Sequence, residues 1–137
     1  MNDGMAESTT IGQTEIRIPY RDIDASGAMH ASAYISHAET AIRAFWRYRP
    51  VIDDEPLFSV RKFECVCHRV PRADEAVQFS VRVEKIGGRT VGFAVAADIG
   101  NEQLADIEIT WTALDRETRE PTALPEEIRD WLYQFLP

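Results

Sequence analysis

The residues of this sequence best suited to chemistry are two aspartates at a predicted strand-to-helix junction. The stretch YRDIDASGAMHASAY, residues 20–34, places Asp22 and Asp24 before a Ser-Gly loop and the start of a helical pattern. The Asp24 carboxyl, with a reference pKa of about 3.9, is ionised at neutral pH and could act as a nucleophile or a general base. The alternative is a cap or turn aspartate, a common structural role at such a junction. Asp22 alternates away from Asp24, which favours a structural role for Asp22.

The residues after Asp24 could supply the other groups needed to attack a carbonyl. Gly27 permits a tight turn between the carboxylate and the helix. The first turn of the helix has unpaired N–H groups at its electropositive end, which can polarise a carbonyl. His30 could order a water or the substrate, or it could close the loop or cap the helix. His37 is predicted to be a partly buried packing histidine.

The segment CVCH, residues 65–68, contains residue types that bind metals. No second C-x-x-C or histidine pair completes a zinc site. On a strand, Cys65 and Cys67 would point to one face and His68 to the other. We therefore expect buried, reduced thiols with no disulfide, no metal and no cofactor.

The composition indicates one soluble globular domain. The chain has 137 residues, of which 45% are hydrophobic and 28% charged, enough for a core without disulfides. The formal net charge of −8 argues against nucleic-acid binding, which requires a basic surface. No apolar run is long enough to span a membrane. Residues 1–13 do not resemble a secretory signal and are expected to be a disordered lead, and a cytoplasmic location fits the cysteine usage.

The hydrophobic pattern of the first half predicts a strand and a long helix. Residues 14–21 alternate, with Ile16, Ile18 and Tyr20 on the apolar face. The period becomes helical over residues 33–48, with an alanine-rich apolar stripe. Small side chains on such a stripe favour close packing against a sheet.

The second half is predicted to be almost entirely strand. The alternation changes phase between Val60 and Phe63, which predicts a β-bulge or bend. The glycine pair at 87–88 is expected to supply the positive φ of a tight hairpin, and residues 100–101 form a second turn. An amphipathic helix with Pro125 in its first turn ends the pattern.

These elements predict an α+β fold in the domain formed by residues 14–137. One antiparallel sheet of about five or six strands would wrap around one long central helix, with a short C-terminal helix. The other sheet face and the sheet edges would be uncovered. Pairing with a second copy is the usual remedy.

Three segments of the sequence, covering nearly the whole chain, resemble the hot-dog-fold acyl-CoA thioesterases, in particular the 4-hydroxybenzoyl-CoA thioesterase family. In the first, Asp22, Asp24, Gly27 and Tyr34 match the family's D-x-D, glycine and tyrosine positions, and Glu39 falls where the family often has an acid. The second, VPRADE, is similar to a proline-containing turn between two strands. The third, ALDRETREPTALPEEI, is similar to the family's ending.

The resemblance implies hydrolysis of an acyl-CoA or acyl-carrier thioester to a free carboxylic acid and a thiol. Asp24 would attack the carbonyl to give a mixed anhydride, or would activate a water. The amide of Ala31 would polarise the thioester carbonyl, and Tyr34 would lie at the substrate. Coenzyme A would be part of the substrate rather than a cofactor. The family also implies a homodimer or homotetramer with its pocket at the dimer interface.

Coenzyme A requires basic groups for its phosphates, and two arginines lie next to predicted turns of the sheet. Arg72 and Arg89 are the candidates, although each could equally be a solvated arginine. Glu39 could face the acyl pocket, or it could be held in an ion pair. The acidic composition favours coenzyme A over an acidic carrier protein.

Three positions depart from the family pattern and leave alternatives open. His30 and Ala31 stand where many relatives have Asn, or Tyr followed by His, and Ala33 replaces a frequent Asn. These losses support a non-catalytic protein that binds acyl thioesters. An enoyl-thioester hydratase is the other alternative, although such enzymes pair a His with an Asp or Glu in motifs that this sequence lacks.

Overall fold

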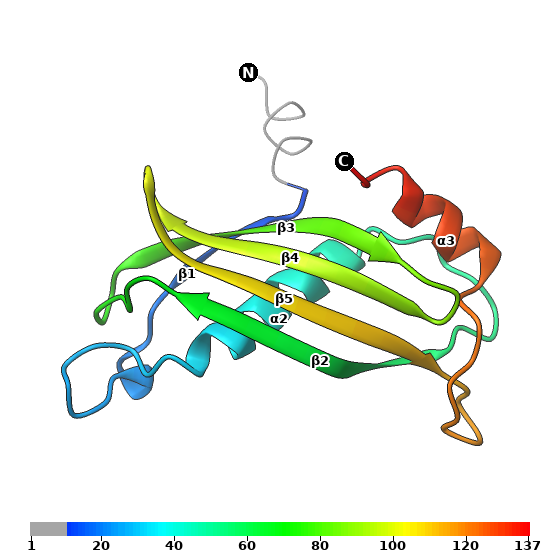
Figure 1. Ribbon diagram of the computed structural model, residues 1–137, viewed down its shortest axis with the longest axis horizontal. Helices are drawn as coiled ribbons and strands as arrows, with labels where there is room; N and C mark the ends of the chain where they lie inside the picture. Colours follow the sequence, from blue (N-terminus) through cyan, green and yellow to red (C-terminus); the bar gives the residue numbers. More distant parts are fainter. Residues whose placement is uncertain (1–10) are drawn as a thin grey trace.

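A curved antiparallel sheet wraps around one long helix (Figure 1). The computed structural model describes residues 11–137. Most of the expected lead, residues 1–10, lies outside the described residues. Residues 11–12 form a turn and the first strand begins at Gln13, so regular structure starts slightly before the predicted domain boundary.

Five strands form the sheet in the order β1-β3-β4-β5-β2, and every neighbouring pair is antiparallel. The strands are β1 (Gln13–Arg17), β2 (Leu57–Cys67), β3 (Ala76–Ile86), β4 (Thr90–Ile99) and β5 (Glu102–Leu114). Because β1 and β2 lie at the two edges, the helix between them in sequence must cross the whole sheet. That crossing brings the chain from one edge to the other and encloses the core.

The central helix, α2 (Ala33–Trp46), buries the predicted stripe against the sheet. Tyr34, Ala38, Ala41 and Ile42 are completely buried. Alanine at two of these positions lets the helix backbone approach the strands closely. The helix ends at Trp46 rather than at the predicted residue 48, because the chain turns toward Pro50.

The inward-facing residues of the sheet follow the predicted alternation. The buried residues that keep this alternation in the three central strands are Val77, Phe79, Val83, Val91, Phe93, Val95, Ala97, Ala105, Ile107, Ile109, Trp111 and Ala113. Ala94 and Leu104 are buried in addition, outside the alternation. The pairing of β2 with β5 shifts register between Val60 and Lys62, which confirms the predicted bulge.

Two local predictions were wrong. The first strand ends at Arg17, and Tyr20 begins a short 3-10 turn, η1 (Tyr20–Asp22), in which it is 82% exposed. Gly87 and Gly88 do form a hairpin turn but neither has a positive φ. A Cβ on Gly87 would lie 2.6 Å from the Thr90 hydroxyl, so close approach rather than backbone conformation requires the glycine.

The C-terminal helix, α3 (Glu126–Tyr133), closes one end of the core. Pro125 occupies its N-cap position, and Ile128 and Leu132 are completely buried. Beside them the Trp131 ring stacks on Phe45 of α2 with centroids 5.0 Å apart. The helix therefore lies across the end of α2 that is farthest from the residue 20–32 loop (Figure 1).

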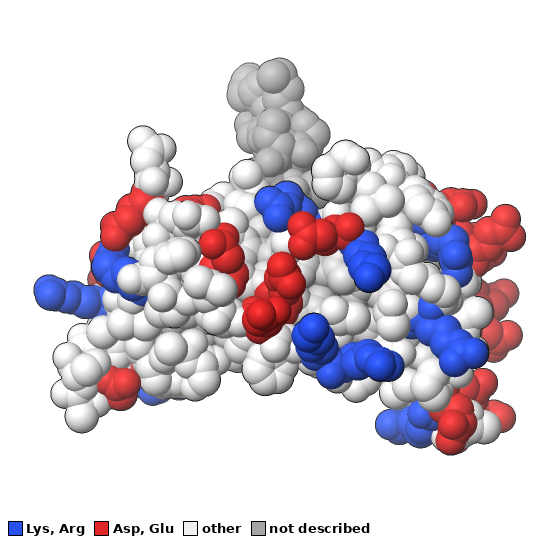
Figure 2. Space-filling model, viewed as in Figure 1, with Lys and Arg blue, Asp and Glu red and all other residues white. Residues whose placement is uncertain are grey.

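Within residues 11–137 of the single chain, no element covers the outer face of the sheet or the edge of β2. One cross-strand row of the outer face runs Arg82, Ala94, Glu108, Glu64, and Figure 2 shows acidic and basic side chains intermixed over the molecule from this viewpoint. On β2 the apolar Phe63 is 57% exposed. Within residues 11–137, neither helix has the length and apolar character that crossing a bilayer requires.

Candidate active site

The two aspartates lie in a compact loop between η1 and α2, at the end of the sheet opposite α3 (Figure 1). An isolated bridge pairs Ile23 with Met29 and closes the loop at its base. Inside it, the Asp24 amide donates to the Ala28 carbonyl and the Gly27 amide donates to the Asp24 carbonyl, each at 3.0 Å. Gly27 has a φ of +86° with open space around its Cα, so the turn requires glycine for backbone conformation.

The Asp24 carboxylate is exposed and held on one side only. Its Oδ1 accepts hydrogen bonds from the Ser26 hydroxyl at 2.6 Å and the Ser26 amide at 2.8 Å. Among the described residues, Oδ2 has no hydrogen-bond partner. The bonds from the Ser26 hydroxyl and amide lower the pKa of Asp24, so the group is an anion with one oxygen fixed and the other available.

The cap role considered for Asp24 is excluded by the position of the helix. Helix α2 begins nine residues later, and its N-cap position is Ser32. The contact with Ser26 is instead an Asx turn, which is the turn role considered from the sequence. This geometry fixes the carboxylate but does not use both of its oxygens.

The residues that lead into α2 place polar groups near this loop. His30 is exposed, and its Nδ1 lies 2.9 Å from the Ser32 hydroxyl. The Ala31 carbonyl accepts the Tyr34 amide, while the Ala31 amide makes no hydrogen bond to another described residue. The helix entrance therefore has an unpaired N–H at its electropositive end.

Tyr34 has a structural position in the single chain. Its ring is completely buried, and its hydroxyl donates to the Arg69 carbonyl at 2.5 Å. Burial raises the pKa of Tyr34 well above its usual value, so the phenol stays protonated and remains a donor. In the single chain, the Tyr34 hydroxyl proton is therefore already used by Arg69 and is not free for the expected contact with a substrate.

Arg72 and Arg89 lie at opposite ends of the sheet. Arg72 is exposed in the loop before β3, next to Pro71, whose carbonyl accepts the Met29 amide at 2.8 Å. Arg89 is exposed in the turn after β3. The intervening strand of 11 residues spans about 35 Å, so of these two arginines it is Arg72 that neighbours the Asp24 loop of the same chain.

Glu39 is half-buried on α2, and among the described residues it forms no ion pair. The ion-pair alternative is therefore not realised within residues 11–137. Four residues along the helix, the Arg43 guanidinium lies over the Trp111 ring at 4.9 Å from its centroid instead.

Two side-chain contacts of the loop were not predicted from the sequence. His37 donates from Nε2 to Asp22 Oδ2 at 2.7 Å, so the packing histidine and the structural aspartate form one pair. Because Asp22 and His37 are 15 residues apart, no local sequence pattern could have predicted this contact. A turn role for Asp24 was considered from the sequence without naming Ser26, although an aspartate side chain commonly accepts the backbone amide two residues on.

The two cysteines are free, as expected, but only one is partly buried. Cys65 is half-buried, and burial raises the pKa of its thiol, whereas Cys67 is exposed. The prediction of two buried thiols was therefore wrong for Cys67, because Cys67 lies at the end of β2, an edge strand that is paired on one side only within residues 11–137. Among residues 11–137, no three His, Cys, Asp or Glu side chains gather in an arrangement that could hold a metal ion.

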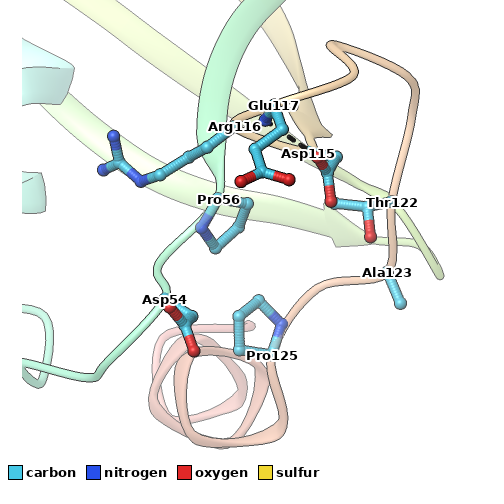
Figure 3. Close-up of a pocket in the computed structure, with 8 residues that line it drawn as sticks. All are labelled: Asp54, Pro56, Asp115, Arg116, Glu117, Thr122, Ala123 and Pro125. Atoms are coloured by element: carbon cyan, nitrogen blue, oxygen red, sulfur yellow. Dashed lines mark hydrogen bonds between the residues drawn. The ribbon is translucent and has the colours of Figure 1, made fainter.

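A cavity of about 410 Å³ lies at the opposite end of the molecule, near the start of α3 (Figure 3). Asp54, Asp115 and Glu117 give it an acidic lining. Asp115 Oδ1 accepts the amides of Glu117 and Thr118 at 2.8 and 2.9 Å, so this carboxylate closes a turn. The cavity has no contact with the Asp24 loop.

Comparisons with known proteins agree with the architecture described above. The chain is 23% identical over 127 residues to the acyl-CoA thioester hydrolase YbgC of Escherichia coli O6:H1, covering 88% of this chain and 95% of the relative. No family model matches the sequence.

Solved structures with thioesterase names superpose closely on this chain. YbaW of Escherichia coli, described as a probable thioesterase, has a TM-score of 0.79 at 18% identity and covers 91% of this chain and 98% of its own. A 1,4-dihydroxy-2-naphthoyl-CoA thioesterase from Synechocystis has a TM-score of 0.78 at 8% identity, with 88% and 94% covered. The predicted hot-dog fold and the resemblance to thioesterases of that fold are therefore confirmed.

Proposed function

We propose that this chain, a thioester hydrolase with the hot-dog fold, cleaves an acyl-CoA to a free carboxylic acid and coenzyme A with Asp24 as its reactive carboxylate. The observation that carries the proposal is the asymmetry of Asp24. Its Oδ1 is fixed by Ser26, and its Oδ2 has no partner among residues 11–137. A carboxylate held in this way is ionised, oriented and still able to react.

Two routes are open to such a carboxylate. In the first, Oδ2 attacks the thioester carbonyl carbon, the C–S bond breaks to release the thiolate, and water then hydrolyses the mixed anhydride. In the second, Oδ2 accepts a proton from a water that attacks the same carbon, and the C–S bond then breaks to release the thiolate. Both routes place negative charge on the carbonyl oxygen, and the unpaired Ala31 amide at the entrance of α2 is the donor we assign to that oxygen.

The substrate would approach from the open side of the Asp24 loop. Arg72 of the same chain neighbours this loop, and we assign it to a phosphate of coenzyme A. A second copy paired along the edge of β2 would cover Phe63 and provide the other wall of the acyl pocket. Arg89 and Glu39 could join the site from that second copy. We place the reaction in the cytoplasm, where coenzyme A thioesters would meet the enzyme.

One observation favours a different function. The Asx turn with Ser26 would also be formed by an aspartate with no catalytic part. Together with the alanines at 31 and 33, it supports a protein that binds acyl thioesters without hydrolysing them. Such a protein would release no thiol from any substrate.

The test is thiol release from a panel of acyl-CoAs of different chain length and aromatic content, followed with a thiol reagent. We expect the wild-type protein to release thiol and Asp24→Asn to lose at least about 100-fold in kcat, because the amide is neither a nucleophile nor a base. The matched control is Asp53→Asn, an exposed aspartate in the connection between α2 and β2, which should retain full activity.

Undiminished turnover by Asp24→Asn would contradict the role of Asp24. Binding of an acyl-CoA by a wild-type protein that releases no thiol would favour the binding alternative. Loss of the enoyl chromophore of an enoyl-CoA without thiol release would identify a hydratase.

A further inference from the structure

We infer that Asp22 and His37 form an anchor that positions the Asp24 loop on the central helix, so that His37 is a positioning residue for the reaction. The kinetic part of this inference rests on the proposed function. The structural part concerns the folded protein alone and has its own measurement.

The anchor is a short and shielded hydrogen bond. His37 Nε2 lies 2.7 Å from Asp22 Oδ2, and the two side chains are only 13% and 14% exposed. Water therefore competes poorly for either partner, which strengthens the bond relative to one at the surface. The surface pair His68–Asp106, at 3.3 Å with side chains 45% and 51% exposed, lacks this shielding.

Asp22 connects the anchor to both ends of the reactive loop. It ends the η1 turn, and its amide donates to the Pro19 carbonyl at 3.0 Å. Its own carbonyl accepts the His30 amide at 2.9 Å. Asp24 is therefore two residues from the anchor on one side, inside a loop whose far end returns to Asp22.

His37 connects the same anchor to the core. It lies on α2, one turn after the buried Tyr34, and its ring packs on Phe79 of β3 with centroids 6.0 Å apart. Within residues 11–137, this is the side-chain hydrogen bond that joins residues 20–30 to the residues of α2. The other ties of the loop to the body of the protein include the Met29 amide bond to Pro71 and the buried Met29 side chain.

This arrangement has a consequence for the reactive carboxylate. The unpaired Ala31 amide belongs to the entrance of α2, whereas the Asp24 carboxylate belongs to the loop. Their relative position must be held to a fraction of an ångström for attack on a carbonyl. The Asp22–His37 bond fixes the loop to the same helix that presents the amide.

The experiment compares His37→Leu, which cannot donate, with His37→Gln, whose amide N–H can reach the position of the imidazole Nε2. We expect His37→Leu to lower kcat about 10- to 100-fold with KM essentially unchanged. We expect His37→Gln to retain a kcat close to that of the wild type. His68→Leu, the same change in the exposed pair, should leave both constants at their wild-type values.

A second measurement does not depend on activity. Hydrogen exchange of the His30 amide, which donates to the Asp22 carbonyl, should be faster in His37→Leu than in His37→Gln or the wild type. If the wild type hydrolyses no acyl-CoA in the panel, the proposed function fails, and this exchange measurement still decides whether the anchor exists. Asp22→Ala and Asp22→Asn repeat the comparison from the other side of the bond if His37→Leu does not fold.

The positioning role would be overturned if His37→Leu kept the wild-type kcat, or if His37→Gln lost as much kcat as His37→Leu. Unchanged exchange at His30 in His37→Leu would overturn the anchor itself.

Discussion

At the scale of single residues, the informative feature is the unequal use of the two oxygens of Asp24. Ser26 supplies both hydrogen bonds to Oδ1, from its hydroxyl and from its amide. These bonds stabilise the anion and fix its orientation, and Oδ2 has no hydrogen-bond partner in the part of the chain that the structure describes. Ser26 therefore tunes the carboxylate that we propose as the reactive group, and the family resemblance did not point to Ser26.

The first prediction concerns pH. The Ser26 hydroxyl is the main cause of the lowered pKa of Asp24, so the acidic limb of kcat/KM should lie below the pH at which an ordinary carboxyl titrates. A depressed pKa means that the active anion persists as the pH falls. Ser26→Ala removes the hydroxyl, raises the pKa of Asp24 and should move the acidic limb to higher pH.

The measurement is kcat/KM as a function of pH across the acidic range for both proteins. Ser36→Ala, a change at an exposed serine on α2, is the control and should leave the limb where it is. An identical limb in the wild type and Ser26→Ala would contradict the assignment of that limb to Asp24.

At the scale of elements, the site depends on how α2 is held. The Tyr34 hydroxyl ties its first turn to the Arg69 carbonyl, at the end of β2. Arg69 in turn bonds Glu102 with two guanidinium nitrogens at 2.6 and 2.9 Å, which links this point to the β4–β5 hairpin. The last turns of α2 are covered by α3, so the helix is fixed at both ends.

The second prediction concerns the contribution of α3. Leu132 is completely buried, so Leu132→Ala should lower the free energy of unfolding by about 2 to 4 kcal/mol through lost burial and the cavity left behind. Tyr133→Ala on the same helix changes a residue that is 49% exposed and should cost about 1 kcal/mol or less. Chemical denaturation measures both, and equal losses would contradict a core role for α3.

At the scale of the whole molecule, the single chain has an open, partly apolar strand edge beside its candidate site. Among the described residues of one chain, no strand pairs with the outer edge of β2, and Phe63 and Val66 on that strand are 57% and 54% exposed. An exposed edge with apolar residues favours pairing with another chain. A homodimer through β2 would cover this edge and enclose the open side of the Asp24 loop, and pairing of outer sheet faces could then give a dimer of dimers.

The third prediction tests this dimer. Phe63→Glu should shift the protein toward the monomer and reduce activity with it, because a charge would be buried at the paired edge. Val51→Glu places the same charge on a completely exposed residue in the connection before β2 and should leave the assembly unchanged. Sedimentation velocity gives the mass of each. A wild-type monomer with full activity would contradict the shared site.

The sequence alone predicted the order of the elements, the buried stripe of α2 and the bulge near Val60, because each is carried by the periodicity of neighbouring residues. It also singled out Asp24 and Gly27 through a short motif. It failed at Tyr20 and at the Gly87–Gly88 turn, where the preference of one residue is overridden by its tertiary surroundings.

Only the tertiary structure decided which side chains meet. Two hydrogen bonds join residues 15 or more positions apart, the one between Asp22 and His37 and the one from Tyr34 to Arg69. The fold likewise decides that Arg72 and Arg89 lie at opposite ends of a strand. Such contacts depend on how the sheet curves around α2, and no local pattern of polar or apolar residues records that curvature. Local sequence determines each element and its buried face, whereas the packing of elements determines the environment of every reactive group.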